Sequence, residues 1–189
     1  MSRAYRIQVS ESVHRVIRAS DHVSTRLEIL QILPPEDMAG LLRQELEQHG
    51  FTPEGGQMVK ADGEAKIAVE PATGTVTVTA EADQEVSMKR TESGFSYTQE
   101  KAETKKAKEA LRQQVLKNLD AQVNAEQAKL QKELTDKLEA QLGDVRKELD
   151  QIANKVMAEA LKVKAKQMGQ VKEITEDPQS GSLTIVVEV

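Results

Sequence analysis

Histidine, cysteine and closely spaced carboxylates are the side chains that most often bind metals or carry catalysis. The chain has three histidines, His14, His22 and His49, and none has the close spacing of metal ligands such as H-x-x-x-H. It has no cysteine, which excludes disulfides, thiolate metal sites and thiol nucleophiles. We therefore expect no metal and no cofactor.

Other catalytic signatures are missing as well. The sequence contains no G-x-S-x-G, no P-loop and no dinucleotide-binding glycine fingerprint. The adjacent glycines Gly55-Gly56 belong to none of these motifs. Aspartate and glutamate are numerous but scattered, so no pair of carboxylates is marked out for acid-base work. We do not expect an enzyme.

Composition limits the size of the core. Only 2 % of the 189 residues are aromatic, and charged residues make up 30 % with both signs present. Because aromatic side chains give the largest single burials, a large globular core is not expected. The net charge of −5 hides a modest asymmetry, because residues 1–96 and 169–189 are acidic and residues 97–168 carry a slight positive excess, but no segment is basic enough to predict phosphate binding on its own.

No apolar run is long enough to cross a membrane, and residues 1–10 lack the apolar core of a signal peptide. We therefore expect a cytoplasmic protein with no membrane association.

The elements that would position any site are dominated by one stretch, residues 96–168. It has no proline, one glycine (Gly143), and mainly Ala, Leu, Lys, Glu and Gln. Ser96 and Gln99 match an S-x-x-Q capping box, and Gly169 follows the last turn. At about 1.5 Å per residue, one continuous helix would be roughly 100 Å long.

An apolar series runs along this stretch in heptad-like steps with a stutter, which predicts a partner helix. We take it as the oligomer or helix-packing interface: Leu116, Leu119, Val123, Leu130, Leu134, Leu138, Leu142, Val145, Leu149, Ile152, Val156 and Val163. The helix could fold back as a helical hairpin near Gly143, or earlier near residues 118–120. The series keeps its phase through Gly143, which favours one long helix and a homo-oligomeric coiled coil.

Residues 1–95 predict short strands and one helix. We expect a hairpin from strands at residues 5–9 and 13–18, a strand at 24–33, and a helix from Pro35 to His49 that Gly50 ends. The same reasoning predicts a meander at residues 57–60, 65–69 and 75–79, one more strand at 85–89, and a loop at 91–95.

The C-terminal tail repeats a sequence pattern found in the predicted meander. Residues 70–78 and 177–185 share the order acidic, Pro, two residues, Gly, Ser/Thr, aliphatic, Thr, aliphatic, which predicts a terminal hairpin of residues 171–175 and 183–189. We expect an α+β fold: a small, mostly antiparallel sheet domain with one covering helix (residues 1–95), a long coiled-coil helix or helical hairpin (96–168), and a C-terminal β-hairpin that completes a sheet of its own chain or of a neighbour (169–189).

The whole chain resembles a known family. Four segments show the resemblance: MSRAYRIQVSESVHRVIRASDHVSTRLEILQILP, PEDMAGLLRQELEQHGF, the long Ala/Leu/Lys/Glu helix and VKEITEDPQSGSLTIVVEV. These are similar to an accessory protein of bacterial ternary conflict systems, which group an FtsH-like or MoxR-like AAA+ ATPase with a von Willebrand A domain protein. The resemblance implies a non-catalytic component and carries no functional residues over.

We therefore expect a scaffold or adaptor that acts by protein–protein interaction, with an AAA+ ATPase or a von Willebrand A domain protein as its partner. The alternative is a nucleic-acid-binding module that uses the N-terminal arginines Arg3, Arg6, Arg15 and Arg18. Nucleic acid is the less expected partner because no basic stripe with stacking aromatics is present.

Overall fold

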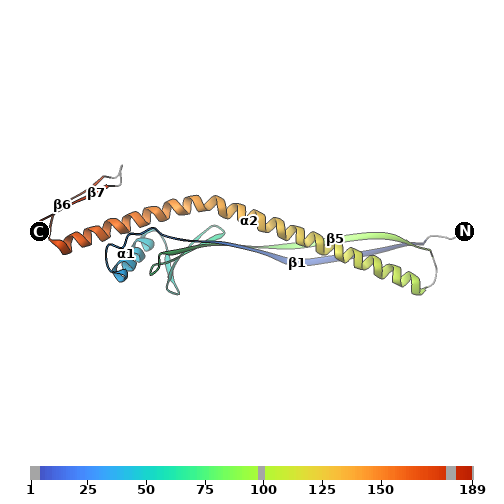
Figure 1. Cartoon of the computed structure of the whole chain (residues 1–189). Coiled ribbons are helices and arrows are strands. Elements are labelled where there is room, and N and C mark those ends of the chain that lie inside the picture. Colours follow the sequence, from blue (N-terminus) through green and yellow to red (C-terminus); the bar gives the residue numbers. More distant parts are fainter. Residues whose placement is uncertain (1–4, 98–100, 178–181, 189) are drawn as a thin grey trace. The chain divides into compact units, whose positions relative to one another are not determined.

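The computed structural model describes residues 5–97, 101–177 and 182–188 and confirms the α+β class. Five strands form one sheet in the order β1-β5-β4-β3-β2, and two more strands form a second sheet, β6-β7 (Figure 1). The helices are α1 (Pro35–Gln48) and α2 (Lys101–Met168).

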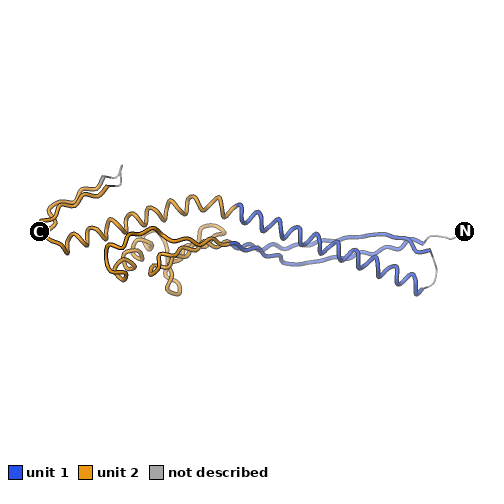
Figure 2. The backbone as a smooth tube through the Cα atoms, viewed as in Figure 1, with its two compact units in different colours: residues 1–21, 81–136 blue, residues 22–80, 137–189 orange. Residues whose placement is uncertain are grey.

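The chain divides into two compact units (Figure 2). Unit 1 comprises residues 1–21 and 81–136, and unit 2 comprises residues 22–80 and 137–189. The three longest elements, β1, β5 and α2, each contribute one part to each unit. The units therefore cut across the three consecutive segments that composition suggests.

In unit 1, strands β1 (Tyr5–Arg26) and β5 (Thr75–Ser96) supply one apolar face to α2. Side chains alternate between buried and exposed along both strands, as a ribbon covered on one face requires. Ile17, Val86 and Val123 form a buried cluster, one from each of the three elements.

The predicted hairpin at residues 5–18 was wrong, because β1 runs through Ser10-Glu11-Ser12 without a turn. Nothing in that tripeptide demands one, since it contains no Gly, Pro or Asn. Glu11 lies on the helix-facing side, where Arg112 Nε pairs with its carboxylate at 2.8 Å. The loop predicted at 91–95 was also wrong, since β5 continues to Ser96.

In unit 2 the predicted meander is confirmed. Strands β2 (Thr52–Glu54), β3 (Gln57–Asp62) and β4 (Ala65–Glu70) pair antiparallel with each other and with the start of β5. The register sets Val69 between Met58 and Val76, which places three buried side chains on one face of the sheet.

Helix α1 agrees with its predicted bounds to within one residue. Pro35 fills its first turn, and Gly50 (φ +84°) ends it. Phe51 N–H donates to Leu46 O and Gly50 N–H donates to Glu47 O, each at 3.0 Å, which is the bond pattern of a Schellman motif. The buried Phe51 and Leu46 supply the apolar pair that accompanies this motif.

The strand predicted at residues 24–33 was wrong beyond Arg26, where β1 ends. Residues 27–34, which we call the strap, have no regular structure. Leu27 N–H donates to Gly74 O at 2.8 Å, and Ile29 and Ile32 each donate to the carbonyl two residues earlier. These three-residue turns bend the chain away from the sheet before α1 begins.

Helix α2 is uninterrupted from Lys101 to Met168, so the helical-hairpin alternative was wrong. Gly143 lies within the helix, and apart from the neighbouring helix backbone no atom lies within 4 Å of the position of a Cβ. At the other end, Gln99 of the predicted capping box lies outside the described residues.

The predicted terminal hairpin is confirmed as β6 (Gln170–Asp177) and β7 (Ser182–Glu188). Its turn lies outside the described residues. Among the described strands it forms a sheet of its own and pairs with no strand of the five-stranded sheet. Lys162 Nζ on α2 pairs with Glu176 Oε1 at 2.7 Å, which ties the hairpin to the helix.

Gly169 joins α2 to the hairpin, and close approach is what this position requires. Its φ is not in the left-handed region, so the expected backbone role is absent. A Cβ at this position would overlap the carbonyl oxygen of Glu188 and lie 3.0 Å from Val187 Cγ1. The last strand therefore passes over residue 169 only while it has no side chain.

We predict opposite effects of alanine at the two glycines of this region. Gly169→Ala should weaken the β6–β7 pairing, seen as faster amide hydrogen exchange in the hairpin. Gly143→Ala, the matched control, should raise the free energy of unfolding by up to about 1 kcal/mol, because alanine favours a helix over glycine by that amount. Unchanged exchange in the hairpin of the Gly169→Ala variant would contradict the close-approach argument.

Candidate interaction surfaces

The members of the apolar series of α2 are buried or half-buried within the single chain. Eight of its members are buried within the single chain: Leu119, Val123, Leu134, Leu138, Val145, Leu149, Ile152 and Val156. Four are half-buried: Leu116, Leu130, Leu142 and Val163. Val115 is fully buried and was missed, although it lies one turn before Leu119 and two before Val123.

The surface that covers this series is the chain's own sheet. In unit 1 the partners of Val123 are Ile17 of β1 and Val86 of β5. In unit 2, Val145 and Leu149 border the same hollow as Val76 and Val78 of β5. The apolar series of α2, which suggested a partner helix, is therefore covered by strands of the same chain. It no longer supports a coiled coil with a second chain.

Polar side chains of α2 flank this contact in unit 1. Asp120 pairs with Arg15 of β1 at 3.1 Å. Gln127 and Gln131 donate side-chain N–H groups to the main-chain oxygens of Arg18 and Ser20 at 3.5 and 3.0 Å. Because β1 is the outermost strand of its sheet, these bonds satisfy carbonyls that a neighbouring strand would otherwise take.

A second polar contact in unit 1 involves a carboxylate with a shifted pKa. Glu92 of β5 accepts from Arg90 Nε at 2.7 Å and from Asn118 Nδ2 of α2 at 3.0 Å. The hydrogen bond from Arg90, followed by that from Asn118, lowers the pKa of Glu92 below its ordinary value of 4.5. The charged carboxylate thus joins strand and helix.

Unit 2 contains a connected set of five charged and polar side chains, Glu45, His49, Lys60, Glu148 and Lys155. Glu148 Oε1 lies 2.7 Å from Lys60 Nζ and 3.4 Å from His49 Nδ1. Glu45 Oε1 lies 3.4 Å from His49 Nε2 and 2.8 Å from Lys155 Nζ; its geometry is that of an ion pair and not of a directed hydrogen bond. The set fixes α1 to α2 and β3, and each member faces another member.

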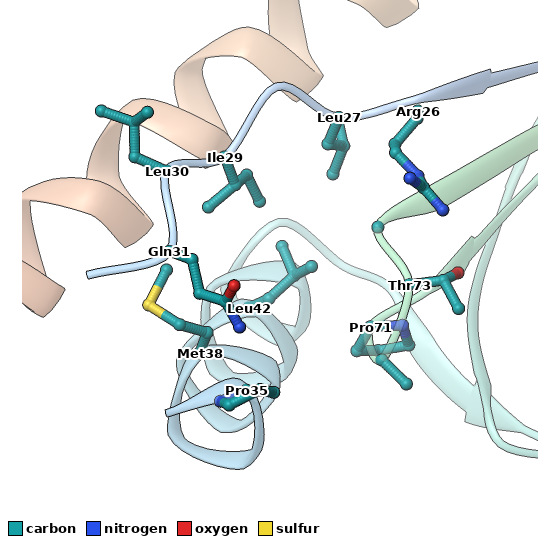
Figure 3. Close-up of a pocket in the computed structure, with 12 residues that line it drawn as sticks. Arg26, Leu27, Ile29, Leu30, Gln31, Pro35, Met38, Leu42, Pro71 and Thr73 are labelled. Carbon is teal, nitrogen blue, oxygen red and sulfur yellow. The ribbon is translucent and has the colours of Figure 1, made fainter. Parts of the chain in front are cut away.

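The strap is bordered by three hollows in unit 2, all lined in part by Arg26 and Leu27. The first, of about 280 Å³, lies between the strap, α1 and the turn from β4 to β5. Figure 3 shows Leu27, Ile29 and Leu42 turned toward it, with Leu30 directed away. The second, of about 340 Å³, lies between strap, strands and α2.

The third hollow, of about 660 Å³, lies on the side of the strap where Met157 of α2 is found. Leu30 borders it and is 70 % exposed. A strap with an exposed leucine between hollows of mixed polar and apolar lining is a surface on which another protein could place side chains.

The structure describes three of the four N-terminal arginines. Arg3 lies outside the described residues, and Arg15 and Arg18 lie beside acidic partners, Asp120 and Asp83. The three described arginines, Arg6 among them, are on β1. Acidic neighbours lower the local positive potential that phosphate binding uses.

Neither a cluster of metal ligands nor a membrane-spanning helix is found among the described residues. Within the ranges 5–97, 101–177 and 182–188, no three histidine or acidic side chains gather as metal ligands would. In the same ranges, neither helix combines the length and apolar character needed to cross a membrane.

Comparison with protein families is decisive for identity. The family model described as "FtsH ternary system domain X5" matches residues 1–189, the whole chain. The chain belongs to this family. Comparison with curated proteins gave no match, and comparison with solved structures gave none either.

Membership in the X5 family confirms the resemblance noted in the sequence: the protein is an accessory protein of the FtsH ternary system. An accessory protein of a ternary system works with protein partners. Among the described residues, the X5 chain has an exposed strap, outer sheet strands and a C-terminal hairpin.

We predict that Glu92 makes the free energy of unfolding depend on pH in the acid range. Its folded-state pKa lies below the unfolded value, so its contribution is present above pH 4.5 and is lost as pH falls through the folded pKa. Wild type should therefore exceed Glu92→Gln in free energy of unfolding at pH 7, by a difference that shrinks below pH 4.5. Urea unfolding across this range measures it.

Glu139→Gln is the matched control, because Glu139 is exposed on α2. A difference between wild type and Glu92→Gln that stays constant from pH 7 to the acid limit would contradict the assignment of this carboxylate.

Proposed function

We propose that this X5-family protein is a non-catalytic adaptor that binds the FtsH-like ATPase of its ternary system by protein–protein contact. The observation that carries the proposal is the strap, whose exposed Leu30 borders two of the three hollows around it. The family description supplies the class of partner.

The chemistry of the strap suits a protein partner. Apolar anchors surrounded by a polar rim are the usual make-up of an interface centre. Around the second hollow, Val23, Leu27 and Leu142 supply apolar surface, and Arg146 and Asp150 stand at the same site as charged groups. The hollows accept side chains, and Leu30 projects one.

The structure of the strap also favours recognition of a protein. It belongs to no strand or helix, and its backbone is fixed by Leu27 N–H on Gly74 O and by two short turns. A segment held in one conformation loses little freedom when a partner binds it. The strap is thus a preformed surface.

The assignment as non-catalytic rests on how the charged groups are used. Glu45, His49 and Glu148 bring two carboxylates and an imidazole together, and they pair among themselves and with Lys60 and Lys155. These pairs join α1, α2 and β3, which is a structural use of charge. They support a protein that acts by shape and contact.

We predict that the purified protein comigrates with the purified FtsH-like ATPase of the same system in size-exclusion chromatography with light scattering. Leu30→Ser should weaken the complex about tenfold or more, since interface anchors commonly contribute more than about 1.4 kcal/mol. Phe95→Ser is the matched control, because Phe95 is 62 % exposed but belongs to unit 1.

Two results would contradict the proposal. Separate elution of the protein and the ATPase at micromolar concentrations would remove the adaptor function. Equal weakening by Leu30→Ser and Phe95→Ser would remove the strap as its surface.

A further inference from the structure

The C-terminal hairpin has the features of a strand donor. It is a two-stranded sheet, and two strands alone are marginally stable in water. Its last strand contains Leu183-Thr-Ile-Val-Val187, an uncharged and mostly β-branched run without proline. Val186 and Ile174 are 45 % and 40 % exposed. An uncharged run that pairs with one strand on one side and with no described strand on the other is a template for pairing with a further strand.

The five-stranded sheet offers its outer strands β1 and β2 and the part of β5 beyond Ala80, where the pairing with β4 ends, and these edges differ as acceptors. Strand β2 at one edge has three residues and contains Pro53, which has no N–H to donate. Strand β1 at the other edge has 22 residues and no proline. Strand β1 and residues 81–96 of β5 are both long enough to accept the seven residues of β7. Residues 81–96 carry four acidic against two basic residues, which disfavours the acidic hairpin and leaves β1 as the better acceptor.

The contacts of α2 show which backbone groups of β1 face the open edge. Gln127 and Gln131 bond the carbonyls of Arg18 and Ser20, two alternate residues, which places the even-numbered N–H and C=O groups at the edge. Odd-numbered residues are the more buried ones from residue 5 to residue 21, except for the exposed Arg15, and the alternation has the same phase before and after it, so this phase holds along the strand. Among the interactions of the described residues, no side chain or loop bonds the even-numbered backbone groups of residues 6–16.

The two strands match in pattern. Leu183, Ile185 and Val187 alternate with more exposed residues on β7, as Ile7 and Val9 do on β1. Pairing would place apolar side chains on one shared face and polar side chains on the other.

Charge favours the same pairing. Strand β1 carries four arginines against two acidic residues, Glu11 and Asp21, whereas the hairpin carries Lys172 against four acidic residues. Opposite charges on neighbouring strands favour association, and they lower the tendency of two hairpins to pair with each other.

We propose that β7 of one copy of this chain adds to the open edge of β1 of a second copy, along residues 6–16. The sheet of each acceptor gains the hairpin of a donor, so the protein associates with itself through its C-terminus. Reciprocal exchange of hairpins closes a dimer. This interface is separate from the strap and does not depend on the ATPase.

The test uses the full chain alone, in size-exclusion chromatography with light scattering over a range of concentrations. We expect wild type to reach twice the chain mass of 20.9 kDa. Val186→Lys adds a cation opposite the arginines of β1 and should weaken association about tenfold or more. Val186→Thr, which stays β-branched and uncharged, should keep it.

The acceptor strand is tested by Ser12→Pro. Proline at this even-numbered position removes an N–H that faces the open edge and leaves the bonds to β5 in place. We therefore expect association to fall while the unfolding midpoint changes little. Ser12→Ala keeps the N–H and should behave as wild type. A mixture of Val186→Lys and Ser12→Pro should associate again, because the first supplies an intact β1 and the second an intact hairpin.

A monomeric wild type at all concentrations would overturn the proposal. So would association that survives both Val186→Lys and Ser12→Pro, or a mixture of the two folded variants that stays monomeric.

Discussion

The contact between the apolar face of α2 and the chain's own sheet is the interaction on which the rest of the structure depends. Leu119, Leu134 and Ile152 are 1 %, 2 % and 0 % exposed in a single chain. Full burial of such a side chain contributes roughly 1.5–3 kcal/mol. A helix of 68 residues and strands of 22 residues are stable here because each covers the apolar face of the other.

Polar contacts fix which part of the helix meets which part of the sheet. In unit 1, Thr135 donates to Asp21 at 2.7 Å, and Gln131 bonds the adjacent Ser20 carbonyl. In unit 2, Lys137 pairs with Glu64 at 3.0 Å. An apolar stripe alone would permit sliding by one helical turn, whereas these bonds are lost on sliding. They therefore specify register more than they add stability.

Much of the fold could be predicted from local sequence. Pro35 and Gly50 mark the ends of α1, and turns at Gly63 and Gly74, both with positive φ, mark the ends of β4. These signals are local because backbone sterics at proline and glycine act within a few residues. The hairpin expected at Ser10–Ser12 failed because Glu11 is accommodated by Arg112, a contact about a hundred residues away in sequence.

The partner of α2 could not be predicted, because an apolar stripe records that a helix is covered and not by what. One detail of the spacing does distinguish the cases. From Leu119 to Val156 the stripe takes roughly ten turns, about 3.7 residues per turn, whereas a left-handed coiled coil needs 3.5. The repeated steps of four between Leu130 and Leu142 suit a straight helix on strands. The strap and the open edge of β1 carry no such periodic signal.

The account makes α2 a helix whose apolar face is covered within one chain, which leaves the strap and the strand edges for partners. Amide hydrogen exchange of α2 at a series of protein concentrations tests this most directly. We expect the amides near Leu119, Leu134 and Ile152 to keep the same protection through a hundredfold dilution, since their cover comes from the same chain. Protection that falls with dilution would contradict the account, because it would show that a second chain covers the helix.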